Sequence, residues 1–266
     1  MEAPSLAVIG AGGTQAGAML EVLVKVIDPR TVLAIDRRWA PAARARLERL
    51  GVTVLTGDIV QDRANLVDRS MGARLVANLA GPAYVVAPAA FDYTLDLGAD
   101  YLDITDDIDA TAALLARGSE ARAKGIAALI GMGSAPGMTN ILCRLALDAL
   151  GDAPDPRIDL ACSVDAADLT PASLRHYFHC LATALPGRTG VPTWEELEPE
   201  QVDFGAPVGL LTALTLGHPE PLTLPRFTRV KTVTNKGAIA PNEVSYLMWL
   251  LARCTNYGVG EAELFR

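Results

Sequence analysis

The sequence has few cysteines, and none of them stands at a spacing typical of a metal site or a disulfide framework. Cys143, Cys162, Cys180 and Cys254 are widely separated, and no C-x-x-C motif occurs. Structural zinc sites and small disulfide-rich folds both depend on closely spaced cysteines, so neither is predicted. We expect free thiols, no bound metal and a cytoplasmic location.

The sequence also lacks a secretory signal, a long uninterrupted apolar segment and an excess of positive charge. No basic segment with a long apolar run opens the chain, and glycine, proline and asparagine interrupt the uncharged stretches after Arg74 and Lys124. Lys and Arg number 23 against 31 Asp and Glu, which gives a net charge of -8. Nucleic acid and anionic membrane are therefore unfavourable partners, and we expect a small molecule instead.

The sequence does contain apolar runs that alternate with helix-forming segments through its first half. After the strand before Gly10, the predicted strands are 31–36, 52–57, 74–80, 100–105 and 126–133. The predicted helices between them include 40–50, 63–71, 87–98 and 109–125. Such alternation builds a parallel sheet with helices on both faces. The predicted fold class is α/β, with a Rossmann-like doubly wound parallel sheet.

The pattern changes near Pro136, where we predict a second, smaller α+β domain for substrate binding or dimerisation. The predicted domains are 1–138 and 139–266. The second contains predicted helices at 139–150, 171–185 and 242–258, strands at 157–164 and 227–234, and a loop at 186–207. Asn242 is the expected N-cap of the last helix and Gly258 its stop.

The first turn, "GAGGTQAG", has the composition of a phosphate-binding turn. Gly10, Gly12 and Gly13 follow a buried strand and precede a helix, whose N-terminal N–H groups can hold a pyrophosphate. Gln15 stands where the dinucleotide fingerprint has its third small residue. That residue normally lets the helix pack closely against the sheet. Asp36 ends the second strand, about 20 residues beyond the turn, as the fingerprint requires.

Asp36 favours NAD, because a carboxylate that accepts the ribose hydroxyls repels a 2′-phosphate. Arg37 and Arg38 follow directly and could recruit that phosphate, so NADP stays an alternative. Asp58 and Ile59, after the third strand, are predicted to meet the adenine; a helix-terminal role for Asp58 is an equal alternative. The complete predicted cofactor set is Gly10, Gly12, Gly13, Thr14, Gln15, Asp36, Arg37, Asp58, Ile59, Leu79, Ala80, Gly81 and Thr105.

Several motifs together resemble the saccharopine dehydrogenase family. They are the G-A-G-G turn, the Asp that ends the second strand, the Y-x-D-x-T segment at 101–105 and the P-G-M-T-N segment at 136–140. The stretches "VDFGAPVG" and "HPEPLTLPRF" are similar to the later part of that family's second domain. The resemblance thus covers most of the chain.

The resemblance implies an NAD(P)-dependent oxidoreductase acting on the C–N bond of an amino-acid-derived substrate, by imine reduction or amine oxidation. It implies that Gly137, Met138, Thr139, Asn140 and Tyr84 line the substrate side of the nicotinamide, with Asp103 nearby. Asp103, Asn140 and a histidine or water would polarise the substrate and deliver a proton.

A substrate that carries carboxylates needs cations, for which Arg175, Arg188 and Lys236 are the candidates, each with a solvated surface charge as the alternative. His176 and His179 are spaced i, i+3 on a predicted helix. His176 is the candidate proton donor, while a metal is not expected because no third ligand follows at a recognisable spacing.

Two other functions stay open at this point. One is a nucleotide-binding regulator or scaffold without catalysis. The other is a related enzyme that reduces a C=C bond, or that oxidises and then re-reduces its substrate without net redox change. We also expect a homodimer, since the apolar segment "YLMWLL" (246–251) can pair subunits, although it can equally pack internally.

Overall fold

A computed structural model describes residues 4–264 and divides the chain into two compact units. The first unit contains residues up to 105 together with 110–133, and the second contains 106–109 together with the residues from 134 on. The predicted boundary at 138/139 stays a prediction. Within the described range no helix has both the length and the apolar character required to span a bilayer.

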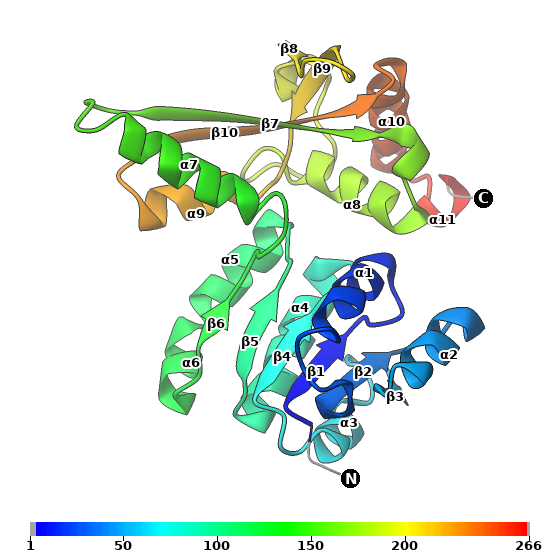
Figure 1. Cartoon of the computed structure of the whole chain (residues 1–266). Helices are drawn as coiled ribbons and strands as arrows, with labels where there is room; N and C mark the ends of the chain where they lie inside the picture. The colour runs from blue at the N-terminus through cyan, green and yellow to red at the C-terminus, as the bar shows by residue number, and fades with distance from the viewer. Residues whose placement is uncertain (1–3, 265–266) are drawn as a thin grey trace. The chain divides into compact units, whose positions relative to one another are not determined.

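The first unit is built on a six-stranded parallel sheet with the order β3-β2-β1-β4-β5-β6 (Figure 1). Its strands are β1 (Leu6–Ile9), β2 (Val32–Asp36), β3 (Thr53–Thr56), β4 (Leu75–Asn78), β5 (Asp100–Asp103) and β6 (Ala128–Leu129). Its helices are α1 (Thr14–Leu23), the short 3-10 helix η1 (Pro29–Thr31), α2 (Pro41–Arg49), α3 (Arg63–Arg69), α4 (Ala83–Leu97), α5 (Ile108–Ala116) and α6 (Gly118–Lys124).

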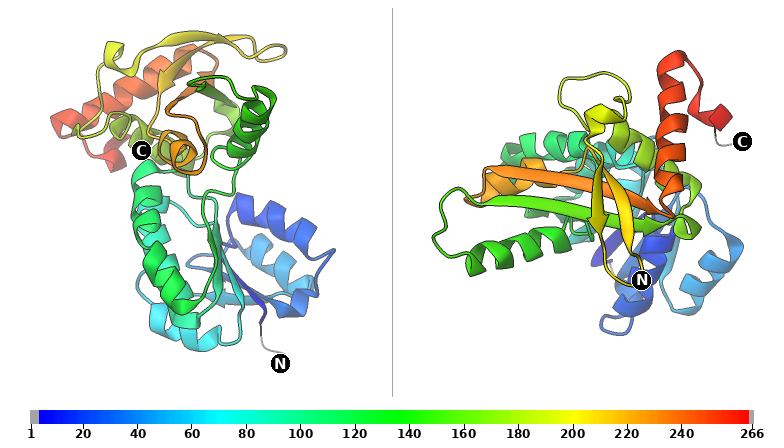
Figure 2. Two further views of the ribbon diagram at one scale, coloured as in Figure 1. Left: turned by 90° about the vertical axis from the view of Figure 1, so that its left-hand side faces the viewer. Right: turned by 90° about the horizontal axis from the view of Figure 1, so that it is seen from above.

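Alternate residues of the strands point to opposite faces, and a separate hydrophobic core forms on each face. On one face Leu6 and Val8 of β1 pack with Leu20 of α1 and Leu47 of α2. On the other, the next residues of the same strands pack against α3, α4, α5 and α6. Figure 2 shows these helices on the two sides of the sheet. The predicted doubly wound fold class is confirmed.

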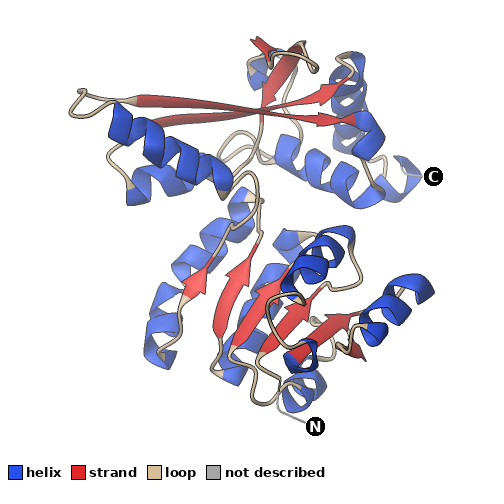
Figure 3. Cartoon of the chain, in the orientation of Figure 1, coloured by secondary structure: helices blue, strands red, loops and turns tan. Residues whose placement is uncertain are grey.

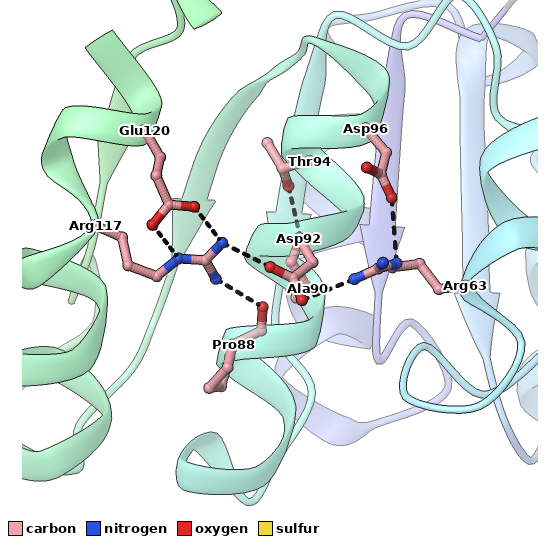
Figure 4. A network of polar contacts seen from close by, with 8 residues as sticks. All are labelled: Arg63, Pro88, Ala90, Asp92, Thr94, Asp96, Arg117 and Glu120. Carbon is pink, nitrogen blue, oxygen red and sulfur yellow. Dashed lines mark hydrogen bonds and ion pairs between the residues drawn. The ribbon is translucent and has the colours of Figure 1, made fainter. Parts of the chain in front are cut away.

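Ion pairs join α4 to its two neighbours on the outer side of the unit (Figure 4). Asp92 of α4 accepts hydrogen bonds from Arg63 of α3 and from Arg117, both at 2.7 Å. Arg117 also pairs with Glu120 and lies 4.8 Å above the Phe91 ring. Because these side chains are partly exposed, solvent screens each pair, and the network mainly fixes the positions of the helices.

The second unit contains a four-stranded sheet with the order β7-β10-β9-β8. Its strands are β7 (Arg157–Asp165), β8 (Glu200–Asp203), β9 (Leu210–Thr215) and β10 (Thr232–Ala240). β7 and β10 are parallel over nine residue pairs, while β9 runs antiparallel to both β10 and β8. The long β7–β10 pair is the central feature of this unit in Figures 1 and 3.

Helices pack near both ends of the β7–β10 pair (Figure 3). They are α7 (Met138–Ala149), α8 (Pro171–Ala182), α9 (Glu220–Phe227), α10 (Glu243–Cys254) and α11 (Glu261–Leu264), with the 3-10 helices η2 (Ala166–Asp168), η3 (Glu195–Leu197) and η4 (Thr255–Tyr257). Leu181 of α8, Leu214 of β9 and Ile239 of β10 form one core. Leu147 of α7 and Leu224 of α9 belong to a second.

Some predicted elements of the second half are wrong. The region expected to be a loop at 186–207 contains η3 and the edge strand β8, and neither β9 nor α9 was predicted from the sequence. The strand expected at 227–234 begins only at Thr232, because Phe227 still belongs to α9. In the first half, β6 has two residues only, and the helix expected at 109–125 breaks at Arg117 into α5 and α6.

Asn242 is the N-cap residue of α10, as expected, but its side chain has a different partner. Its Oδ1 accepts a hydrogen bond from the Thr212 N–H of β9 at 2.6 Å, and within the described residues it makes no cap bond to α10.

The segment "YLMWLL" is divided between two environments. Met248 and Trp249 pack against the core, whereas Tyr246, Leu247 and Leu250 are exposed, so the homodimer stays a prediction.

Candidate functional site

The glycine turn after β1 has a backbone that only glycine can supply at its first position. Gly10 has a φ of +78°, and a Cβ there would lie 2.6 Å from the backbone of Ala80. The turn therefore lies directly against the residues that follow β4. Ala80 and its neighbours Leu79 and Gly81, all predicted to contact the cofactor, are thus beside the turn at the carboxyl ends of the strands.

The same turn is tied to the end of β2. The Gly12 N–H donates to Asp36 Oδ2 at 2.9 Å, and Asp36 Oδ1 accepts from the Arg38 N–H at 3.0 Å. A Cβ on Gly12 would lie 3.0 Å from both the Asp36 carboxylate and the Arg38 carbonyl. Each carboxylate oxygen has two lone pairs, so Asp36 can still accept further hydroxyl groups. Arg37 is exposed beside it.

The first turn of α1 is open to a ligand. Gly13 is the N-cap residue, and no side chain among residues 4–264 caps this end of the helix. The first N–H groups of a helix have no partner inside it, and the helix dipole makes this end attractive to anions. Thr14 and Gln15 are exposed here. A hollow of about 540 Å³ adjoins the turn, and its lining includes Gly12, Gly13, Thr14 and Arg46.

The departure at Gln15 does not disturb the packing of helix against sheet. Gln15 is exposed, while the next residue, Ala16, is fully buried in the core beneath α1, and Gly17 is buried as well. The small packing residue therefore stands one position later than the G-x-G-x-x-G fingerprint expects. Gly10, Gly13 and Ala16 form an evenly spaced G-x-x-G-x-x-A series, which was the signal to look for.

The residues after β3 have local roles. Asp58 Oδ1 accepts from the Val60 N–H at 2.9 Å, and Ile59 is buried with 5% exposure in the core beneath α4. Asp58 therefore shapes the turn before α3. The adenine contacts predicted for Asp58 and Ile59 stay predictions.

Asp103 lies in a fully buried hydrogen-bond network at the end of β5. Its Oδ2 accepts from Tyr101 Oη at 2.9 Å and from Thr105 Oγ1 at 2.6 Å, and its Oδ1 accepts from the Gly131 N–H at 2.7 Å. Asn78 of β4 donates to Tyr101 Oη at 3.3 Å. Burial raises the pKa of Asp103, and these donors act in the opposite direction.

These contacts use both oxygens of Asp103 and fix the ends of β4, β5 and the segment after β6. Thr105, predicted to bind the cofactor, is buried in the same network, and Tyr84 is partly buried in α4. Asn78 and Tyr101 were not predicted as site residues. Tyr101 opens the Y-x-D-x-T segment, and Asn78 directly precedes the predicted cofactor residues Leu79, Ala80 and Gly81. The catalytic role of Asp103 stays a prediction.

In the second unit, the P-G-M-T-N segment forms the start of α7. Gly137 is its N-cap residue, and Asn140 Oδ1 accepts from the Gly137 N–H at 3.0 Å. Thr139 Oγ1 donates to Glu220 Oε1 at 2.8 Å. Met138 is 61% exposed. Asn140 and Thr139 thus hold this turn against α9, and Met138 is the member that faces solvent.

His176 belongs to a cluster that the sequence did not reveal. Its Nδ1 lies 2.9 Å from Asp107 Oδ1, and its Nε2 lies 3.3 Å from both Asp106 Oδ2 and Cys180 Sγ. The His218 ring is 5.7 Å away. Burial alone lowers the pKa of His176, but Cys180 and Asp107 outweigh it and raise the pKa to about 12.

A buried carboxylate also lies beside His218. Its Nδ1 lies 3.7 Å from Oε2 of the fully buried Glu220. Burial alone lowers the pKa of His218, but Cys180 and Glu220 outweigh it and raise the pKa to about 10. His179, the other histidine of α8, pairs with Asp109 at 3.1 Å instead. The i, i+4 spacing of His176 and Cys180 was the available sequence signal.

At least two of the three cations that were expected to bind a substrate carboxylate pair with carboxylates of this chain. Arg188 pairs with Glu196. Lys236 pairs with Glu200 Oε2 at 2.9 Å and donates to the Glu198 carbonyl at 2.7 Å, so it joins β10 to η3 and β8. Arg175 is exposed on α8. Substrate contacts of Arg175 and Arg188 stay predictions.

Comparisons with solved structures agree with this architecture. Saccharopine dehydrogenase (L-Glu forming) from Saccharomyces cerevisiae matches 87% of the chain with a TM-score of 0.58 and 15% identity. Homospermidine synthase from Legionella pneumophila, solved in complex with NAD, matches 97% with a TM-score of 0.58 and 12% identity. The fold is saccharopine dehydrogenase-like.

The likeness covers only part of those proteins. The chain spans 54% of the saccharopine dehydrogenase and 69% of the homospermidine synthase. Triphenylmethane reductase from Citrobacter matches 47% of each chain, with 23% identity and a TM-score of 0.39. No protein-family model and no curated protein matches the sequence.

Replacing Asp103 by Asn tests its structural role. The amide nitrogen cannot accept from Tyr101 and Thr105, and an unsatisfied buried donor costs about 1–3 kcal/mol. We expect Asp103→Asn to lower the free energy of unfolding in urea by about 2–4 kcal/mol. The matched control is Asp100→Asn on the same strand, where an exposed carboxylate accepts from the Ala127 N–H. Equal effects of the two variants would contradict the network.

Proposed function

We propose that the protein is an NAD(P)-dependent oxidoreductase that acts on the C–N bond of an amino-acid-derived substrate. The observation that carries the proposal is the uncapped N-terminus of α1 beside a glycine turn that is hydrogen-bonded to Asp36. The saccharopine dehydrogenase-like fold supports it, as does the NAD in the structurally similar homospermidine synthase. The motif resemblance is the reason to propose a C–N bond.

The residues of the first unit fit a dinucleotide. The N–H groups at Thr14 and Gln15 suit the pyrophosphate, and Asp36 suits the ribose hydroxyls. Gly12 has too little space around it for a larger side chain, and the adjoining hollow leaves room beside the turn. When bound, the nicotinamide supplies or accepts the hydride. The proposed cofactor is NAD, with NADP as the alternative that Arg37 and Arg38 would favour.

The proposed substrate contacts come from residues of the second unit and from Tyr84. Met138 and Arg175 are exposed, so each can meet a ligand at the surface of the second unit. Arg188 would first have to leave Glu196. Thr139 and Asn140 already hold the start of α7, so their proposed task is to present its backbone. His176 or water is the proposed proton donor.

Nucleotide binding is the first test, by calorimetric titration with NADH and NADPH. We expect saturable binding that Gly12→Val weakens at least tenfold, because the new side chain would meet Asp36 and Arg38. Gly118→Val is the matched control, since a Cβ there meets only the end of Arg122, at 3.7 Å. Asp36→Ala should weaken NADH more than NADPH. Absence of binding to either nucleotide would overturn the proposal.

Measurements of turnover test the proposed C–N bond chemistry separately from nucleotide binding. With NADH present, we expect oxidation of the cofactor only when a 2-oxo acid and an amine are supplied together, with a secondary amine as product. Arg175→Ala should raise the KM for the oxo acid. The matched control is Arg157→Ala, which removes an exposed arginine that pairs with Asp159 and should leave this KM unchanged. NADH oxidation by the oxo acid alone, or reduction of a C=C bond, would contradict the C–N assignment and leave the cofactor assignment intact.

A further inference from the structure

Three segments of the second unit meet at α8 through the peptide groups of Gly217. The Gly217 N–H donates to the Cys180 carbonyl of α8 at 2.8 Å, and the Gly217 carbonyl accepts from the Ile108 N–H at 3.2 Å. An added Cβ on Gly217 would overlap with Thr183, the C-cap residue of α8. The loop after β9 and the segment 106–109 are therefore held against the same stretch of helix.

This convergence brings three metal-ligating side chains together. His176 and Cys180 stand one turn apart on the same face of α8, and His218 comes from the loop that Gly217 anchors. One nitrogen of each histidine and Cys180 Sγ all lie within 4.8 Å of one another. In a tetrahedral zinc site, the N and S ligands are about 3.5 Å apart, given Zn–N and Zn–S bonds of about 2.0 and 2.3 Å. His176 Nε2 and Cys180 Sγ are 3.3 Å apart.

Each histidine has a buried carboxylate behind its other ring nitrogen. Asp107, with a side chain only 1% exposed, is 2.9 Å from His176 Nδ1. Glu220, fully buried, is 3.7 Å from His218 Nδ1. Metal-binding histidines characteristically donate their second N–H to a carboxylate in this way, which fixes the tautomer and the ring orientation.

The arrangement around His218 is incomplete as it stands. His218 Nδ1 and Glu220 Oε2 are both buried and find no hydrogen-bond partner within residues 4–264. Buried polar groups rarely stay unsatisfied. An ion bound to the other nitrogen of His218 would favour the Nδ1–H tautomer, and a small shift would then join this N–H to Glu220.

The charges of the cluster favour a cation. Asp106, Asp107 and Glu220 contribute carboxylates, and Asp106 Oδ2 is 3.3 Å from His176 Nε2. A divalent ion is attracted to such a group of carboxylates and offsets their charge. The site also has a way in, since the Asp106 side chain is 39% exposed and that of His176 is 25% exposed.

We propose that His176, Cys180 and His218 bind a zinc ion, with Asp106 or a water molecule in the fourth position. Mixed nitrogen and sulfur ligands in tetrahedral arrangement suit zinc, whereas magnesium and calcium prefer oxygen. The site lies entirely in the second unit. With zinc bound, both ring nitrogens of His176 are engaged, so water is then the proton donor of the proposed reaction.

The test uses the full chain, stripped with a chelator, dialysed and titrated with Zn²⁺ against a chromophoric competitor. We expect one equivalent to bind. Cys180→Ser and His218→Ala should each weaken binding more than 100-fold, and Asp107→Asn about 10–100-fold. Matched controls are Cys254→Ser in α10 and His179→Ala, one turn along α8, and both should leave the affinity unchanged. Circular dichroism checks that each variant is folded.

Titration with Co²⁺ provides a readout that needs no variant. Cobalt in this site should give a thiolate charge-transfer band in the near ultraviolet and the intense visible bands of tetrahedral coordination. Absence of stoichiometric Zn²⁺ binding, absence of the thiolate band in the unchanged chain, or equal affinity of Cys180→Ser and the unchanged chain would each overturn the proposal. If Cys180→Ser does not fold, the cobalt spectrum decides alone.

Discussion

The hydrogen bond from the Gly12 N–H to Asp36 Oδ2 is the contact on which the candidate nucleotide site depends. It joins the turn after β1 to the end of β2, so the first N–H groups of α1 and the carboxylate are held at one place. Gly10 makes this possible, because its positive φ lets the turn lie against the backbone of Ala80. Gly12 and Asp36 therefore stabilise the fold and also form part of the candidate nucleotide site. A substitution at either residue should lower both stability and nucleotide affinity.

Much of the first unit could be predicted from the sequence, because its signals are local. Each buried strand is a short apolar run, and each helix follows within a few residues, so the strands and the doubly wound class could be read directly. Gln15 was a misleading signal. The fingerprint compares single positions, whereas packing needs one small residue facing the sheet, and Ala16 meets that need.

The second unit was less predictable, because its pairing is not local. β7 and β10 pair in parallel although α8, β8, β9 and α9 lie between them in the chain. β8 is a polar edge strand, and α9 contains Pro225, which argues against a helix when only the sequence is considered. The alternating residues at 227–234 indicated a strand, but α9 extends to Phe227, whose side chain is exposed, and the strand begins only at Thr232.

The same absence of local signals concealed the polar contacts of the second unit. Thr139 at the start of α7 donates to Glu220, and Glu220 lies behind His218, which completes the group with His176 and Cys180. Glu220 thus stands between the segment assigned to substrate and the proposed zinc ligands. No spacing rule joins these residues, because they come from separate elements. The Gly217 peptide groups and the packing of Leu216 against α8 bring the helix and the loop together.

Amide hydrogen exchange with and without NADH can locate nucleotide binding at particular N–H groups. The proposed nucleotide site predicts slower exchange at 13–17, at the start of α1, and at 36–38, with no comparable change along β7 or β10. Exchange that is unchanged at the start of α1, or protection confined to the second unit, would contradict it.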